Sequence, residues 1–143
     1  DDGLGDGLAP VEARTVALLY ESVLDRDGGI DTRGLNFWID RREAGLSEEG
    51  LAAQLLDSLE FVARAGAEAI ADDRAFVERI YLNTLDRPGE ERGIDFWVRE
   101  LERADFDRPD LALAFALSAE NIARAPHVET LAEVEPGVWD FVA

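Results

Sequence analysis

The first candidate for binding chemistry in this sequence is an acidic loop over residues 25–31, which reads Asp-Arg-Asp-Gly-Gly-Ile-Asp. Its carboxylates Asp25, Asp27 and Asp31 stand at places one, three and seven, and Ca²⁺ prefers oxygen ligands of this kind. An EF-hand loop also requires an oxygen ligand at place five, glycine at six and glutamate at twelve. Because the loop departs from that pattern at all three places, the alternative interpretation is that Asp25 and Asp31 are turn and helix-cap residues. The three carboxylates therefore make calcium a candidate ligand, although the loop does not match the EF-hand pattern.

A second set of residues combines aromatic rings with an arginine and a glutamate, and it occurs twice. The two sets are Tyr20, Arg26, Trp38 and Glu60, and then Tyr81, Arg87, Trp97 and Glu120. Such rings can form a platform for a sugar, whereas at helical spacing beside leucine and valine they are more typical of a core. The arginines can bind an anionic ligand. Recurrence of a glutamate with each arginine instead favours an ion pair that ties the first loop to a later helix.

The composition excludes most catalytic chemistry. The chain has no cysteine, which excludes disulfides, thiolate nucleophiles and cysteine zinc sites. All fourteen basic residues are arginine, so Schiff-base chemistry and a P-loop are also excluded. The one histidine, His127, excludes a metal site with paired histidines and is expected at the surface or at a helix start. We therefore expect that the protein is not an enzyme and carries no cofactor other than the candidate calcium.

The charge of the chain restricts its partners. The formal net charge is −18, and no basic stripe offsets it, so we expect no nucleic acid partner. No apolar run approaches the roughly 20 residues of a membrane span, so we expect no membrane insertion. An acidic, lysine-free surface suits a salty or calcium-containing medium, where screening relieves self-repulsion. It is equally typical of a GC-rich genome, and the two interpretations are compatible.

These residues recur because residues 15–66 match residues 76–125 at an offset that drifts between 59 and 61. For example, Phe37-Trp38-Ile39 corresponds to Phe96-Trp97-Val98. This pattern predicts a tandem duplication. We expect an acidic, glycine-rich linker over residues 1–9, a first repeat over 10–70, a second repeat over 71–126 and a tail over 127–143.

Within each repeat the apolar residues follow helical spacing, as in Val16, Leu19, Tyr20 and Val23. Helices are expected to begin near residues 10, 31 and 47 in the first copy and near 72, 90 and 107 in the second, with a short last helix capped by a serine in each. No segment shows convincing strand alternation. The sequence predicts an all-α fold, with about three to four helices per repeat packed into one compact bundle-like domain.

Gly34 and Gly93 stand in the first turn of the second helix of each repeat, where glycine costs up to about 1 kcal/mol of helix propensity. A close approach between helices at these positions would explain why each repeat has glycine there.

The repeated string is Tyr-x3-Leu-x-Arg, a short turn, Gly-Leu-x-x-Trp or Gly-Ile-x-x-Trp, and a helix with Ser-x-Glu. Over roughly residues 13–125 it resembles the bacterial family DUF4214, a helical domain of unknown function. It is more weakly similar to phycobilisome linker domains. The DUF4214 resemblance implies an extracellular or cell-surface location in bacteria, because that family tends to occur in large secreted or surface proteins, often beside calcium-binding RTX repeats.

The tail holds a Pro136-Gly137 turn, followed by Trp139 and Phe141. Either it packs back on the helices or it presents an aromatic anchor to a partner. We expect a non-catalytic interaction, assembly or adhesion module of a larger secreted or cell-surface bacterial protein, with a protein or extracellular polysaccharide as partner. The alternative is a module that binds calcium or polysaccharide through loops 25–33 and 86–92.

Overall fold

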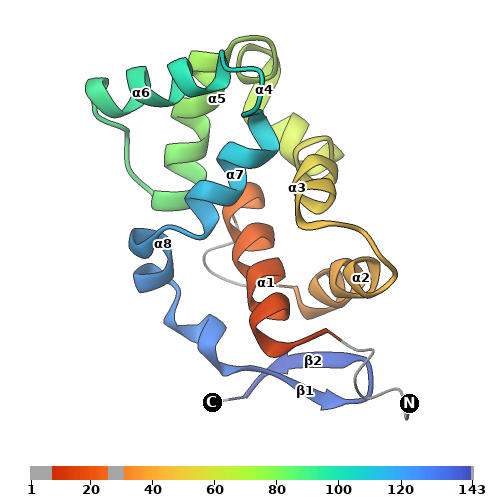
Figure 1. The fold of residues 1–143 in the computed structure, drawn as a ribbon. Coiled ribbons are helices and arrows are strands. Elements are labelled where there is room, and N and C mark those ends of the chain that lie inside the picture. The colour runs from red at the N-terminus through yellow and green to blue at the C-terminus, as the bar shows by residue number, and fades with distance from the viewer. Residues whose placement is uncertain (1–7, 26–30, 143) are drawn as a thin grey trace.

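The computed structural model describes residues 8–25 and 31–142 of the chain (Figure 1). Its elements are α1 (Pro10–Leu24), α2 (Thr32–Glu43), α3 (Glu48–Leu56), α4 (Leu59–Ala71), α5 (Asp73–Ile80), the π-helix η2 (Tyr81–Leu85), α6 (Glu91–Leu101), α7 (Arg108–Ala116), α8 (Ala119–Arg124), the 3₁₀-helix η3 (Pro126–Thr130), β1 (Leu131–Glu135) and β2 (Val138–Phe141). The predicted all-α class is confirmed for the body of the protein. Helices α5 and η2 together correspond to α1, α6 to α2, α7 to α3, and α8 to the first half of α4.

The helices begin where the sequence predicts, because most of them carry a side-chain cap. Asp31 accepts a hydrogen bond from the backbone N–H of Arg33 (3.0 Å) at the start of α2. Ser58 and Ser118 cap α4 and α8 in the same way. A capping side chain satisfies one of the free N–H groups of the first turn and typically contributes about 1 kcal/mol. Helix α4 runs past its counterpart and bends at Gly66, whose φ is 83°.

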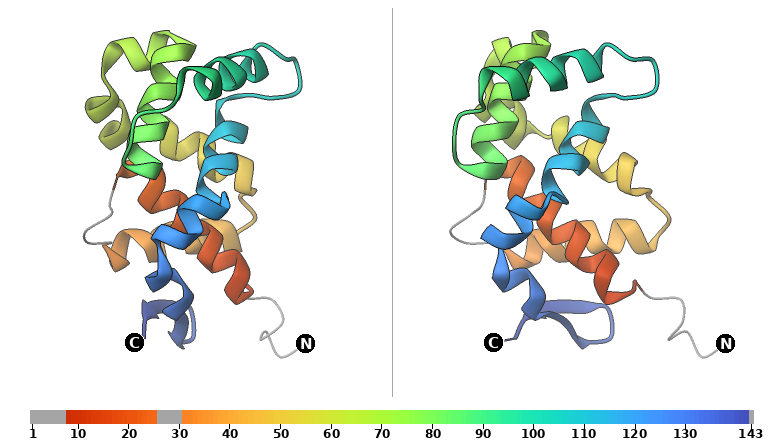
Figure 2. Two further views of the ribbon diagram at one scale, coloured as in Figure 1. Left: turned by 90° about the vertical axis from the view of Figure 1, so that its left-hand side faces the viewer. Right: turned by 60° about the vertical axis from the view of Figure 1, so that its left-hand side comes forward.

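The two repeats share one core, and α1 lies at its centre (Figures 1 and 2). Helix α1 packs on α7 and η2, and α3 packs on α7, so first-repeat helices lie against second-repeat helices. Because neighbours surround α1, eleven of its fifteen residues are buried. Its few polar side chains therefore need partners inside the protein.

A tyrosine explains the glycine in the second helix of each repeat. A Cβ at Gly34 would lie 2.1 Å from the Tyr20 hydroxyl, and one at Gly93 would lie 2.6 Å from the Tyr81 hydroxyl. Both tyrosines are buried, at 4% and 7% exposure, and have little room to move. The expected close approach is present at these glycines, and the contact comes from the tyrosine side chain of the first helix.

The expectation that no segment forms a strand is wrong for the tail. Strands β1 and β2 pair antiparallel across a turn in which Gly137 has a φ of 77°. Asn36 of α2 holds this hairpin: the Trp139 N–H donates to its Oδ1 (2.8 Å), and its Nδ2 donates to the Trp139 carbonyl (2.9 Å). The strands are short, and contacts to a distant helix stabilise them, so local alternation gives a weak signal.

The partner-anchor interpretation of the tail is wrong for Trp139, which is 2% exposed and belongs to the core. Phe141 is half-buried, with its ring centroid 5.6 Å from that of His127. The tail packs back on α1 and α2, because burial of the large indole removes much apolar surface from water. Among the described residues, no helix has the length and apolar character of a membrane span.

Candidate functional site

The recurring motif residues of the second repeat converge on one open pocket of about 160 Å³. It is lined by Tyr81, Leu85, Arg87, Trp97, Ala114, Phe115, Ser118 and Glu120. Six of these stand at motif positions; Ala114 and Phe115 are the two that do not. The pocket is therefore built from the pattern that identifies each repeat, although the residues are up to 39 positions apart.

Four elements position the lining residues. Helix η2 supplies Tyr81 and Leu85, α6 supplies Trp97, α7 supplies Phe115, and α8 supplies Glu120. The Tyr81 and Phe115 rings meet edge to face at 4.8 Å, and the Trp97 and Phe115 centroids are 5.3 Å apart. Tyr81 and Phe115 are buried while Trp97 is half-buried, so the aromatic group forms an apolar floor as well as part of the core.

The ion pair expected between Arg87 and Glu120 is present at the rim of the pocket. The Nε and Nη2 atoms of Arg87 donate to the two carboxylate oxygens of Glu120 at 2.8 and 2.9 Å. The Arg87 guanidinium also lies over the Tyr81 ring, 5.5 Å from its centroid. The hydrogen bond from Arg87 lowers the pKa of Glu120, and the same bond raises the pKa of Arg87. Both groups are charged at neutral pH, and together they are nearly neutral.

The first repeat is described only in part at the equivalent place. Arg26 lies outside the described residues. Glu60 lies in α4, where its Oε2 is 3.9 Å from Nη2 of Arg64. Tyr20 is buried and Trp38 is half-buried, as their counterparts Tyr81 and Trp97 are. The aromatic residues of both repeats therefore pack against the core. Trp97 also faces the pocket.

The acidic loop yields two cap residues where it is described. Asp25 ends α1 in the left-handed conformation with a φ of 56°, and Asp86 ends η2 in the same way with a φ of 54°. Asp31 caps α2, and Asp27 lies outside the described residues. Within residues 8–25 and 31–142, no group of three acidic or histidine side chains is arranged to hold a metal ion.

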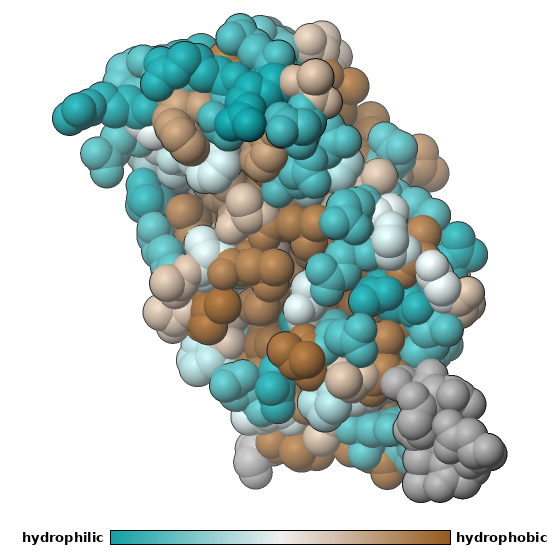
Figure 3. Space-filling view, in the orientation of Figure 1, coloured by the Kyte–Doolittle hydropathy of each residue, from teal (hydrophilic) through white to brown (hydrophobic). Residues whose placement is uncertain are grey.

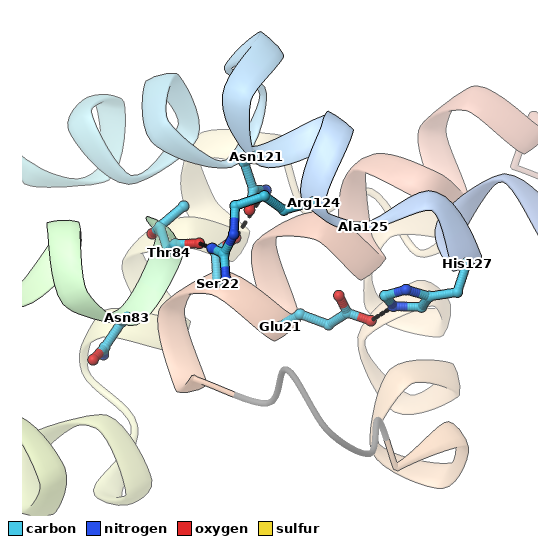
Figure 4. A pocket seen from close by; sticks show the side chains of 8 residues that line it. All are labelled: Glu21, Ser22, Asn83, Thr84, Asn121, Arg124, Ala125 and His127. Carbon is cyan, nitrogen blue, oxygen red and sulfur yellow. Dashed lines mark hydrogen bonds and ion pairs between the residues drawn. The ribbon is translucent and has the colours of Figure 1, made fainter. Parts of the chain in front are cut away.

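A cluster of polar residues lies where the repeats meet (Figure 4). Its buried members are Glu21 and Ser22 from α1, Asn83 and Thr84 from η2, and Asn121 from α8. Arg124, Ala125 and His127 complete the lining of a cavity of about 40 Å³. A water molecule needs roughly 10–15 Å³ in such a cavity, so this one admits water molecules, and it is well below the roughly 150 Å³ that holds a benzene ring.

The bonds within this cluster join the two repeats. The Asn83 amide donates to the Val23 carbonyl (3.1 Å), and the Asn121 amide donates to the Ser22 hydroxyl (3.3 Å). Figure 4 shows the Glu21 side chain pointing at His127, whose Nε2 lies 2.5 Å from Glu21 Oε2. His127, expected at a surface or helix start, lies in the first turn of η3 and also ties that element to α1. The cluster is therefore a structural connection between helices.

Sequence reasoning missed the roles of Asn36 and of two arginines. Arg64 donates to the Leu24 carbonyl at the end of α1 (3.0 Å), and Arg124 donates to the Thr84 carbonyl near the end of η2 (2.8 Å). These arginines recur at matching positions of the repeats, and that recurrence was a usable signal. Asn36 gave none, because its counterpart in the second repeat is Asp95.

An apolar groove crosses the face seen in Figure 3, where apolar side chains gather over α1, α7 and α8. Its volume is about 170 Å³, and its apolar lining includes Val11, Leu18, Leu117, Ile122 and Val128. Val11, Leu117 and Ile122 are exposed, at 64%, 41% and 46%, while Leu18 and Val128 form a buried base. Three exposed apolar side chains therefore adjoin one apolar groove.

The comparisons with known proteins give one match. A family model described as "Domain of unknown function (DUF4214)" matches residues 7–65 and, in a second overlapping segment, residues 52–125. The two segments agree with the tandem repeat described above. No curated protein and no solved structure gives a significant match to this chain.

Proposed function

The chain belongs to the DUF4214 family, and we propose that it is a non-catalytic interaction module of a larger secreted or cell-surface bacterial protein. The groove between α1 on one side and α8 with η3 on the other is the observation that carries this proposal. A protein partner would bury Val11, Leu117 and Ile122, which the folded chain leaves exposed. The lack of cysteine and lysine supports a non-catalytic role, and the acidic composition suits a salty extracellular medium.

The shape of the groove favours a helical segment as its occupant. Helix α1 forms one side of it, and α8 with η3 forms the other, so an amphipathic helix can lay its apolar face between them. Leu18, Ala125 and Val128 are buried at the base, so anchors spaced along one helix face would meet an apolar surface.

The net charge of the chain indicates the sign of the charge on its partner. At a net charge of −18, two copies of this chain repel each other, so self-association is disfavoured. At the rim Glu129 is strongly exposed, with its Oε2 3.6 Å from Nε of Arg14. A partner segment with basic residues on its polar face gains attraction from the whole acidic surface. We therefore infer a basic amphipathic helix as the partner segment.

A peptide of leucine and arginine with helical apolar spacing tests this proposal in a titration monitored by fluorescence anisotropy. Ile122→Asp places a charge in the groove and should weaken binding at least tenfold, which corresponds to about 1.4 kcal/mol. Val62→Asp is the matched control, because Val62 is the first-repeat counterpart of Ile122, is 41% exposed and does not line the groove. It should bind as the natural chain does.

A second peptide separates groove binding from attraction by charge alone. A scrambled peptide of the same composition has no apolar face and should bind at least tenfold more weakly. Equal binding of the two peptides, or equal loss in the two aspartate variants, would show that the groove recognises no helix and would overturn the proposal.

A further inference from the structure

We propose that the pocket of the second repeat binds a neutral pyranose ring of a saccharide. This site is separate from the α1–α8 groove and does not depend on the protein partner proposed above. The inference rests on the size of the pocket, its apolar floor, the polar pair at its rim and a residue difference between the repeats.

The pocket has room for one six-membered ring. Its volume is about 160 Å³, and an apolar cavity of about 150 Å³ admits benzene. The floor consists of Leu85, Phe115 and the aromatic group of Tyr81 and Trp97. The C–H face of a pyranose can pack on such a floor, while the ring hydroxyls point outward to the rim.

The rim offers both hydrogen-bond donors and acceptors. A guanidinium has five N–H groups, and three of those of Arg87 are used for Glu120 and for the Pro88 carbonyl. Each carboxylate oxygen of Glu120 accepts one bond from Arg87 and has capacity for another. Vicinal hydroxyls both donate and accept, so one sugar can bond to both members of the pair without separating them.

The electrostatics favour a neutral ligand over a charged one. Arg87 and Glu120 neutralise each other, so neither an acidic nor a basic sugar finds an unpaired charge in the pocket. An anionic ligand is also repelled by the net charge of −18. A cationic ligand would compete with Arg87 for Glu120 and for the face of Tyr81.

Two lining residues differ between the repeats: Phe115 of the floor corresponds to Leu55, and Ala114 corresponds to Gln54. The second difference bears on how open this pocket is. Ala114 lines it in α7, and its counterpart in α3 is Gln54. Gln54 is half-buried, and its Oε1 lies 3.5 Å from Nη2 of Arg41. Glutamine suits a helix nearly as well as alanine does. Ala114→Gln therefore puts the first-repeat side chain into the second-repeat pocket with little effect on the helix.

The test uses the full chain labelled with ¹⁵N and the neutral methyl α-pyranosides of glucose, galactose and mannose. At least one of them should shift the indole N–H signal of Trp97 saturably, and the signal of its counterpart Trp38 should stay in place. Ala114→Gln should weaken this binding at least tenfold. Ala123→Gln is the matched control, because Ala123 is exposed on α8 outside the pocket, and it should bind as the natural chain does.

Two further probes address chemistry and folding. Glu120→Gln keeps the size of the side chain and removes the charge that holds Arg87, so it should also weaken binding, with its ¹⁵N spectrum showing that the fold is retained. Cyclohexanol has the ring size without the vicinal hydroxyls and should not saturate the site at matched concentration.

The proposal is overturned if none of the three pyranosides shifts Trp97 up to their solubility limit, or if Trp38 moves equally. Cyclohexanol binding as well as the sugars would show a merely apolar cavity and would also overturn it. Loss of sugar binding would leave the peptide titration of the groove unchanged, so the two proposals fail independently.

Discussion

The contact between the tyrosine of the first helix and the glycine of the second can be tested with a double-mutant cycle. In Gly93→Ala the new Cβ would lie 2.6 Å from the Tyr81 hydroxyl oxygen and 3.7 Å from the next ring atom, Cζ. The first distance is a clash and the second is an ordinary contact. The clash therefore comes from the hydroxyl alone, and Tyr81→Phe should remove it.

The expected energies follow from two opposing terms. Forcing an extra carbon into a packed site costs about 1–3 kcal/mol, while alanine gains up to about 1 kcal/mol over glycine in a helix. Gly93→Ala alone should therefore destabilise the protein by about 0–3 kcal/mol. In the Tyr81→Phe background the same change should stabilise it by up to about 1 kcal/mol, so the coupling energy between the two sites should be about 1–3 kcal/mol.

The first repeat provides the comparison. A Cβ at Gly34 would lie 2.1 Å from the Tyr20 hydroxyl and 3.0 Å from Cζ, so the ring itself is tight against the helix there. Tyr20→Phe should therefore rescue Gly34→Ala only in part, whereas the rescue at Gly93 should be complete. Urea unfolding of both cycles measures these differences. A coupling energy below about 0.5 kcal/mol at Gly93 is within ordinary additivity and would refute the close-contact explanation.

Two further predictions concern the hairpin and the rim of the pocket. Asn36→Asp introduces the residue of the second repeat and removes the donor to the Trp139 carbonyl, so it should cost about 1–3 kcal/mol of stability. Amide exchange should accelerate in β2 but not in α1. Unchanged exchange in β2 would contradict the role of Asn36 in holding the hairpin. Arg87 lowers the pKa of Glu120 from 4.5 in the folded state, so the pair contributes stability above that pH and loses it as the pH falls through the folded pKa. Glu120→Gln should lower the Tm at neutral pH, with the difference disappearing in acid; a pH-independent difference would contradict this origin.

The helices were predictable because their signals are local. Asp31, Ser47 and Ser58 each stand at the start of an apolar pattern with helical spacing, and each accepts a hydrogen bond from the first turn that follows. Internal duplication added a second line of evidence, since each pattern occurs twice. The pairing of Arg87 with Glu120 was predictable for the same reason: two charged residues recurred together across a long separation.

The hairpin was not predictable from local patterns, because a residue 103 positions away holds it. Asn36 makes two hydrogen bonds to Trp139 across the fold. The strands have five and four residues, and a register irregularity between Glu133 and Glu135 interrupts the alternation. A short, irregular pattern of this kind gives little signal until the helix that stabilises it is in place.

The polar cluster between the repeats escaped prediction for a different reason. Asn83 and Asn121 correspond to Ser22 and Phe61 in the first repeat, so a search for recurrence passes over them. Both amides bond across the boundary between the repeats, to Val23 and Ser22. Residues at such a boundary have different neighbours in each repeat, so the side chain that suits one repeat does not suit the other.

The recurring residues and the differing residues have separate consequences for binding. Contacts such as Tyr81 with Gly93, and Arg124 with the end of η2, have counterparts in the first repeat and set the common framework. The small side chain of Ala114 belongs to the second repeat alone and leaves room beside the aromatic floor. The family motif therefore predicts where a pocket lies, and the residue at the position of Ala114 predicts whether it is open. Copies of this domain with alanine, glycine or serine there should bind pyranosides, and copies with glutamine or arginine should not.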